Sequence, residues 1–147
     1  MSIAAKLRRA PGRLASGAFI LNEGIGKLSA DDERAKRLHE MAVGSYPFLA
    51  KVEPKLFVRG LSVVEIALGS ALLLPVVPAG LAGVGLVGFS ASLLGMWWRT
   101  PGMHEERSPR PSPQGAAMAK DVWMLAIGAG LVIDAITAEA RTTRTEA

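Results

Sequence analysis

The sequence contains no cysteine among its 147 residues, and histidine occurs only twice. The lack of cysteine excludes disulfide bonds, thiol nucleophiles, cysteine-ligated zinc and cysteine-held iron–sulfur clusters. His39 and His104 both fall in the expected connections between apolar segments, and the acidic residues around them show no metal-ligand spacing. A haem would need axial His or Met inside the spans, and Met96 and Met124 alone do not make such a site. We therefore expect neither a metal nor a haem.

Charged residues are also scarce, at 20% of the chain, whereas half of the residues are hydrophobic and 16 are glycine. A soluble domain usually carries about a quarter charged residues, so this composition favours a membrane protein. The formal net charge is +4 at pH 7. Because the bases border apolar segments and are mixed with acids, this charge does not indicate a nucleic-acid partner.

The longest charge-free run covers residues 66–98, which is 33 residues without Lys, Arg, Asp or Glu. One membrane-spanning helix needs roughly 20 apolar residues, so the run is too long for one span and close to two. Pro75 and Pro78 interrupt it. Since proline removes a backbone donor and disfavours helical geometry in the preceding residue, the pattern predicts a helical hairpin with arms at 54–74 and 79–98.

Two further apolar segments, residues 122–137 and 14–28, complete a prediction of four membrane spans. Polar positions in the weaker 14–28 segment can face other helices of a bundle, and tilt absorbs a mismatch in length. Three tryptophans lie at segment ends, where amphipathic rings favour the headgroup level, so we expect them to anchor the spans at the membrane interface. They are Trp97, Trp98 and Trp123. The alternative is that these rings are ordinary core aromatics.

The expected fold is therefore all-α, an integral membrane four-helix bundle with a short surface helix in the first connection. A single four-span domain at 14–138 lies between a basic leader at 1–13 and a polar tail at 139–147. Four spans place both termini on one side of the membrane. The positive-inside rule leaves the orientation open, because the connections hold eleven bases while the leader before the first span holds four.

The two longer connections differ in their expected structure. Ser29-Ala30-Asp31-Asp32 resembles a capping box with Asp in place of Glu at its fourth position, and it predicts a surface helix that ends near Gly44. Residues 100–119 contain four prolines and are expected to be irregular.

Ionisable residues inside the expected spans are the first candidates for function, because a central Asp costs about 2.5–3.5 kcal/mol to insert and needs a partner or water. Glu65 lies roughly 16 Å along its helix and so near mid-membrane. Its candidate partners are Asn22, Lys27 and Arg59. Glu23 precedes Lys27 by four residues, the favourable order for a helical ion pair. The candidate polar site comprises Asn22, Glu23, Lys27, Glu65 and Asp134.

Small residues four positions apart recur in the apolar segments and let helix backbones approach closely. We expect them to pack the bundle, with contacts between copies of the chain as the alternative. The pairs are Gly88 and Ser92, Ala91 and Gly95, and Ala126 and Gly130.

Three stretches resemble the DoxX-like family of four-span membrane proteins: Gly24-Ile25-Gly26-Lys27-Leu28, the acid-bearing Val63-Val64-Glu65-Ile66-Ala67-Leu68-Gly69, and the short turn into a glycine-rich span. Residues 113–123 resemble actinobacterial members, and the resemblance covers 14–138. It implies an inner-membrane bundle, and some relatives are subunits of a thiosulfate:quinone oxidoreductase or of redox complexes that handle oxidative stress and thiols. Lys27 and Glu65 match family positions to which no catalytic role is assigned. The lack of cysteine argues against self-contained thiol chemistry.

Three functions follow as expectations. The first is an accessory subunit without its own activity, which organises a redox or envelope complex in the plasma membrane and has lipids and other membrane proteins as partners. The second is a subunit that binds a quinone or another lipid in a cavity between helices, next to the polar residues of the first two spans. The third is a transporter or proton path using Glu65 and Asp134, which the absence of a visible inverted repeat disfavours.

Overall fold

A computed structural model of the protein describes residues 3–105 and 107–145, and this part of the chain is helical throughout apart from its connections. The all-α prediction is therefore confirmed. The elements in chain order are α1 (Ile3–Leu28), α2 (Asp32–Ser45), the 3₁₀ helix η1 (Pro47–Lys51), α3 (Pro54–Leu73), α4 (Ala79–Arg99), α5 (Ala116–Ala119) and α6 (Asp121–Thr145).

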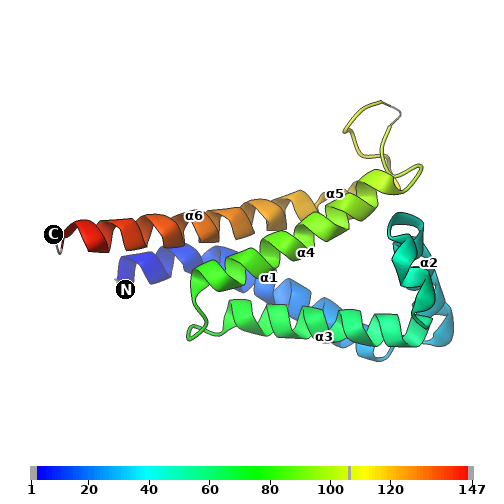
Figure 1. Cartoon of the computed structure of the whole chain (residues 1–147), viewed down its shortest axis with the longest axis horizontal. Helices are drawn as coiled ribbons and strands as arrows, with labels where there is room; N and C mark the ends of the chain where they lie inside the picture. Colours follow the sequence, from blue (N-terminus) through cyan, green and yellow to red (C-terminus); the bar gives the residue numbers. More distant parts are fainter. Residues whose placement is uncertain (1–2, 106, 146–147) are drawn as a thin grey trace.

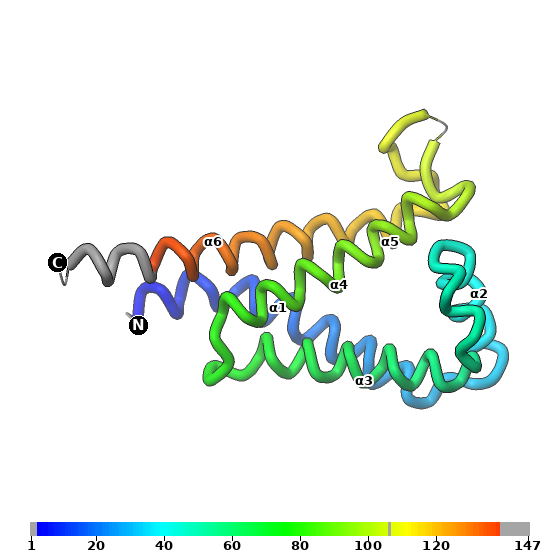
Figure 2. Tube along the Cα trace, viewed as in Figure 1, coloured from blue at the N-terminus to red at the C-terminus, as the bar shows by residue number. Residues whose placement is uncertain are grey.

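The long helices form two pairs that diverge from one end of the molecule (Figure 1). Helix α1 packs along α3, and α4 packs along α6, whereas contacts between the two pairs are few. The pairs meet near the chain termini and the α3–α4 turn, and they separate towards the opposite end, where α2 lies across the opening (Figures 1 and 2). Both termini therefore lie at the same end.

The helical hairpin predicted from the charge-free run is confirmed, with α3 and α4 meeting its expected boundaries to within one residue. Pro54 occupies the first turn of α3, where its missing N–H loses no intrahelical bond. The Glu53 carboxylate accepts a hydrogen bond from the backbone N–H of Leu56 at 3.0 Å and so caps the helix.

The surface helix predicted in the first connection is also present, as α2, and it ends at Ser45. Its N-cap is Asp31 rather than Ser29, because the Asp31 side chain accepts from the backbone N–H of Arg34 at 2.7 Å. The Ser29 hydroxyl instead donates back to the carbonyl of Gly26. The capping-box sequence thus located the helix start but misplaced the cap by two residues.

Three helical segments of the described chain are long and apolar enough to cross a membrane: Pro54–Leu73, Ala79–Arg99 and Ala116–Ala138. Each exposes large apolar side chains, among them Val63, Leu81 and Ile133. Helix α1 is continuous from Ile3, so the basic residues of the expected leader belong to the same helix as the weaker apolar segment.

Glycines on the contact faces allow the two helices of each pair to approach closely. A Cβ added at Gly69 would lie 2.6 Å from the backbone nitrogen of Leu21, and one added at Gly83 would lie 2.9 Å from the carbonyl oxygen of Gly128. In the described part of the chain, no atom other than the local helix backbone lies within 4 Å of a Cβ added at Gly88 or Gly130. The packing role predicted for these two glycines is therefore wrong, because no neighbouring helix approaches either of them closely.

Candidate functional site

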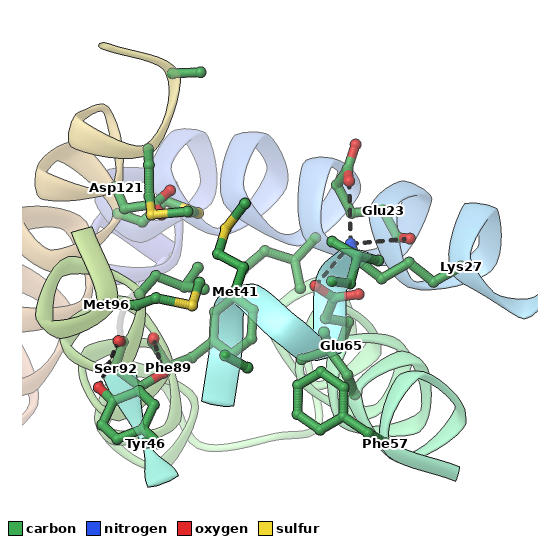
Figure 3. Close-up of a pocket in the computed structure, with 18 of the residues that line it drawn as sticks. Glu23, Lys27, Met41, Tyr46, Phe57, Glu65, Phe89, Ser92, Met96 and Asp121 are labelled. Carbon is green, nitrogen blue, oxygen red and sulfur yellow. Dashed lines mark hydrogen bonds and ion pairs between the residues drawn. The ribbon is translucent and has the colours of Figure 1, made fainter. Parts of the chain in front are cut away.

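A cavity of about 680 Å³ opens between the two helix pairs at the end covered by α2 (Figure 3). Its wall takes side chains from α1, α3, α4 and α6, and also from α2, η1, α5 and the loop before α5. The cavity exists because the pairs diverge there, so no helix fills the space between them. Its volume lies in the range of about 300–1,000 Å³ typical of small-molecule sites.

The wall of this cavity gathers most of the aromatic and sulfur-containing side chains of the protein. All four phenylalanines, the single tyrosine and five of the six methionines line it. Methionine is unbranched and polarisable, so it adapts to ligands of irregular shape, and aromatic rings supply large apolar contact areas. The residues are Phe19, Phe48, Phe57, Phe89, Tyr46, Met41, Met96, Met103, Met118 and Met124.

An ion cluster of Glu23, Lys27 and Glu65 lies on the α1–α3 side of this wall (Figure 3). The Lys27 ammonium lies 3.0 Å from Glu65 Oε1 and 3.1 Å from Glu23 Oε2, and its third contact is the Glu23 carbonyl at 3.4 Å. The side chains of Lys27 and Glu65 are only 10% and 6% exposed. Lys27 is thus the partner of Glu65, and Glu23 and Lys27 form the expected pair along α1.

Close backbone approach explains why Glu65 lies against α1. A Cβ added at Gly24 would lie 2.9 Å from the Cβ of Glu65, so only glycine leaves room for this contact. The hydroxyl of Ser62, one turn earlier in α3, donates to the Gly24 carbonyl at 2.6 Å in the interior. These two contacts fix the register of α1 against α3 and place Lys27 next to Glu65.

The other two members of the predicted polar site lie elsewhere. Asn22 is exposed and does not line the cavity. Asp134 lies near the termini, where its carboxylate forms ion pairs with Arg8 and with the buried Arg9. The structure therefore brings together three of the five residues and gives Asp134 a separate contact between α1 and α6.

Arg13 adds a further link at the same end of the molecule. Its guanidinium donates to four backbone carbonyls at 2.7–3.1 Å, and they lie at the end of α3 and in the turn into α4. The acceptors are Ala71, Leu72, Leu74 and Val77. The last carbonyls of a helix lack intrahelical donors and carry partial negative charge, so Arg13 stabilises the turn that joins the two helix pairs.

Helix α2 closes the open end by contacts to both pairs. On the α4 side, the Tyr46 hydroxyl donates to the Ser92 carbonyl at 2.8 Å and the Ser45 hydroxyl donates to the Met96 carbonyl at 3.3 Å. On the α3 side, the Lys55 ammonium lies 2.8 Å from Oδ1 of Asp32, the first residue of α2. These contacts tie α2 across the cavity from one pair to the other.

The tryptophans expected at the membrane interface have different surroundings. Trp97 is buried, and its indole N–H donates to the Met103 carbonyl at 3.0 Å. Trp98 and Trp123 are 55% and 66% exposed, and His104 stacks on Trp98 with 4.8 Å between ring centroids. Trp97 is therefore a structural contact of the loop after α4, whereas Trp98 and Trp123 are accessible at helix ends.

Asp121 is a wall residue that the sequence reasoning did not select. It opens α6 and lies on the side of the cavity away from Glu65 (Figure 3). The only indication in the sequence was its place at the start of an apolar segment, next to Lys120. Within the described residues, no group of three or more His, Asp or Glu side chains lies close enough to hold a metal ion.

Comparisons of this chain with protein-family models, with curated proteins and with solved structures find no match. The cavity and its ion cluster are therefore the features of the molecule that indicate a function.

Proposed function

We propose that this protein is a small multi-pass protein of the inner membrane that binds a lipophilic molecule in the cavity between its two helix pairs. The observation that carries the proposal is the gathering of every phenylalanine, the tyrosine and five methionines around one cavity beside the buried Lys27–Glu65 ion pair. Apolar walls with a few convergent polar groups are the usual form of a small-molecule site. The ligand classes that the sequence favours are a quinone and another lipid.

In this proposal α1 is a fourth span, because its cations have partners inside the protein. Lys27 contacts Glu23 and Glu65, and Arg13 donates to the carbonyls of the α3–α4 turn. Ionisable residues in membrane helices face the bundle interior and pair with one another or with backbone carbonyls. These contacts support a four-helix arrangement in which α1 lies beside the three apolar spans.

The resemblance to the DoxX-like family supports a second candidate, an accessory subunit of a membrane redox or envelope complex. The structural observation in its favour is the open surface at Gly88 and Gly130. Small residues on an unoccupied helix face leave room for close approach of another helix, from a partner protein or from a second copy. The Lys27–Glu65 contact involves the two positions that match the family.

The test of ligand binding is purification of tagged protein from its native membrane in a mild detergent, followed by mass spectrometry of co-purified lipids and proteins. We expect the wild-type protein to retain a lipophile at a fixed stoichiometry, and Ala117→Trp, which fills the cavity from α5, to lose it. Ala126→Trp is the matched control, because Ala126 is exposed on α6 and does not line the cavity.

Equal lipid content in wild-type protein and both variants would contradict the binding proposal. A stoichiometric protein partner, found without any cavity ligand, would favour the accessory subunit instead.

A further inference from the structure

The charged groups on the cavity wall are three carboxylates and one ammonium: Glu23, Glu65, Asp121 and Lys27. The ammonium is already engaged by Glu65 Oε1 and by the carboxylate and carbonyl oxygens of Glu23. An oxygen acceptor on a ligand, such as a quinone carbonyl, would have to displace one of these contacts.

The neutral donors on the wall are also engaged. The Tyr46 hydroxyl donates to the Ser92 carbonyl at 2.8 Å, and the Ser92 hydroxyl donates to the Phe89 carbonyl at 2.7 Å. Gln114 carries the remaining polar donor group among the wall side chains, and it is exposed. The interior of the cavity therefore offers few free donors.

Free acceptors, in contrast, are present on two sides. Glu65 is only 5% exposed, and its Oε2 is buried with no hydrogen-bond partner within the described residues. Within those residues, no side chain pairs with the Asp121 carboxylate either. A buried acceptor without a donor carries a large desolvation penalty, which a ligand that brings a donor would remove.

The aromatic wall adds attraction for a cation, because the faces of phenyl and phenol rings are electron-rich. Phe57 and Phe89 line the cavity from α3 and α4, and Tyr46 lies at its α2 end (Figure 3). An apolar tail would meet the methionines, while a positively charged headgroup would meet rings and carboxylate oxygens.

We propose that the cavity selects lipophilic amines in their protonated form, with Glu65 Oε2 as the principal acceptor of the ammonium headgroup and Asp121 as a second acceptor. This assignment rests on the proposed binding function and names the class of ligand. Glu65 Oε1 stays with Lys27, so the headgroup and Lys27 share one carboxylate through different oxygens.

The test uses the full-length protein in nanodiscs of phosphatidylcholine, with dodecylammonium, dodecanol and decylubiquinone as probes. Affinity is obtained from the ligand-induced rise in melting temperature followed by tryptophan fluorescence, after correction for partition into protein-free nanodiscs. We expect dodecylammonium to bind about 10- to 100-fold more tightly than dodecanol, the range for a hydrogen bond to a charged group.

Glu65→Gln keeps the shape of the side chain and should abolish most of this preference, measured as the ratio of dodecylammonium to dodecanol affinity. Glu40→Gln is the matched control, because Glu40 is 63% exposed, pairs with Lys36 and does not line the cavity. If Glu65→Gln does not fold, Asp121→Asn should still lower the preference.

Equal affinity of the wild-type protein for all three probes would overturn the amine assignment and leave the binding function intact. A preference that persists in both Glu65→Gln and Asp121→Asn would also overturn it. If no probe raises the melting temperature of the wild-type protein in a saturable way, and the melting temperature of Ala117→Trp responds to every probe as that of the wild type does, the proposed binding function itself fails.

Discussion

Replacing Gly69 by alanine tests whether α1 and α3 are held together by close backbone packing. The added Cβ would lie 2.6 Å from the backbone nitrogen of Leu21 and 2.8 Å from its Cα. Backbone atoms cannot rotate away, so α1 must move from α3 as a unit. Overpacking of this kind costs about 1–3 kcal/mol, and the displacement would also lengthen the Lys27–Glu65 contact.

Gly60→Ala is the matched control, because Gly60 belongs to the same helix and no described atom beyond the local helix backbone lies within 4 Å of its added Cβ. Both substitutions gain up to about 1 kcal/mol of helix propensity. That gain cancels in the comparison, so the difference between the variants measures the steric cost alone. We expect Gly60→Ala to equal or exceed the wild type in stability and Gly69→Ala to fall about 1–3 kcal/mol below Gly60→Ala.

The free energy of unfolding can be measured by titration with sodium dodecyl sulfate in mixed micelles, followed by circular dichroism. If the two variants agree within about 0.5 kcal/mol, the normal scatter for neutral surface substitutions, the close contact between α1 and α3 does not exist in the protein.

Three further predictions concern the two ends of the molecule. Arg13→Met should lower the free energy of unfolding by about 1–2 kcal/mol in the same titration, because four carbonyls at the α3–α4 turn lose a shared donor. Arg13→Lys should recover only part of the lost stability, and full recovery would contradict a role for the guanidinium group. Asp134→Asn should speed proteolysis near the termini by removing the ion pairs of the Asp134 carboxylate with Arg8 and Arg9 while leaving ligand binding unchanged, and loss of binding would link this site to the cavity. The hydroxyl oxygens of Ser45 and Thr100 are 3.4 Å apart, so Ser45→Cys combined with Thr100→Cys should form a disulfide in this cysteine-free chain. The disulfide should slow ligand entry at least severalfold in stopped-flow fluorescence, and dithiothreitol should reverse the effect. Unchanged entry would show that α2 does not cover the path.

Local patterns in the sequence were sufficient to predict where helices α2, α3 and α4 lie. Charge-free length and two prolines located the α3–α4 hairpin, and the Asp-rich start located α2. Glu65 could be selected as a functional candidate because a buried acid in an apolar helix is costly whatever surrounds it. These inferences depend only on neighbours along the chain, which the sequence shows directly.

Contacts between segments that are far apart in the sequence could not be predicted from local patterns. Lys27 was one of three candidate partners for Glu65, and only the register of α1 against α3 selects it. The pairing of Asp134 with Arg8 joins residues from opposite ends of the chain. A cavity between helices beside the polar residues was one of the expectations, but its wall of phenylalanines and methionines was not predicted, because these residues are scattered along the sequence and come together only in the folded chain.

The partners of α1 have a consequence for synthesis of the protein. Three cations of α1 contact groups that come later in the chain. Lys27 pairs with Glu65 of α3, Arg13 donates to carbonyls of the α3–α4 turn, and Arg9 pairs with Asp134 of α6. Because α1 is synthesised first, these contacts can form only after α3, the α3–α4 turn and finally α6 have been translated. The pair between Arg9 and Asp134 is therefore the last of the three that can form.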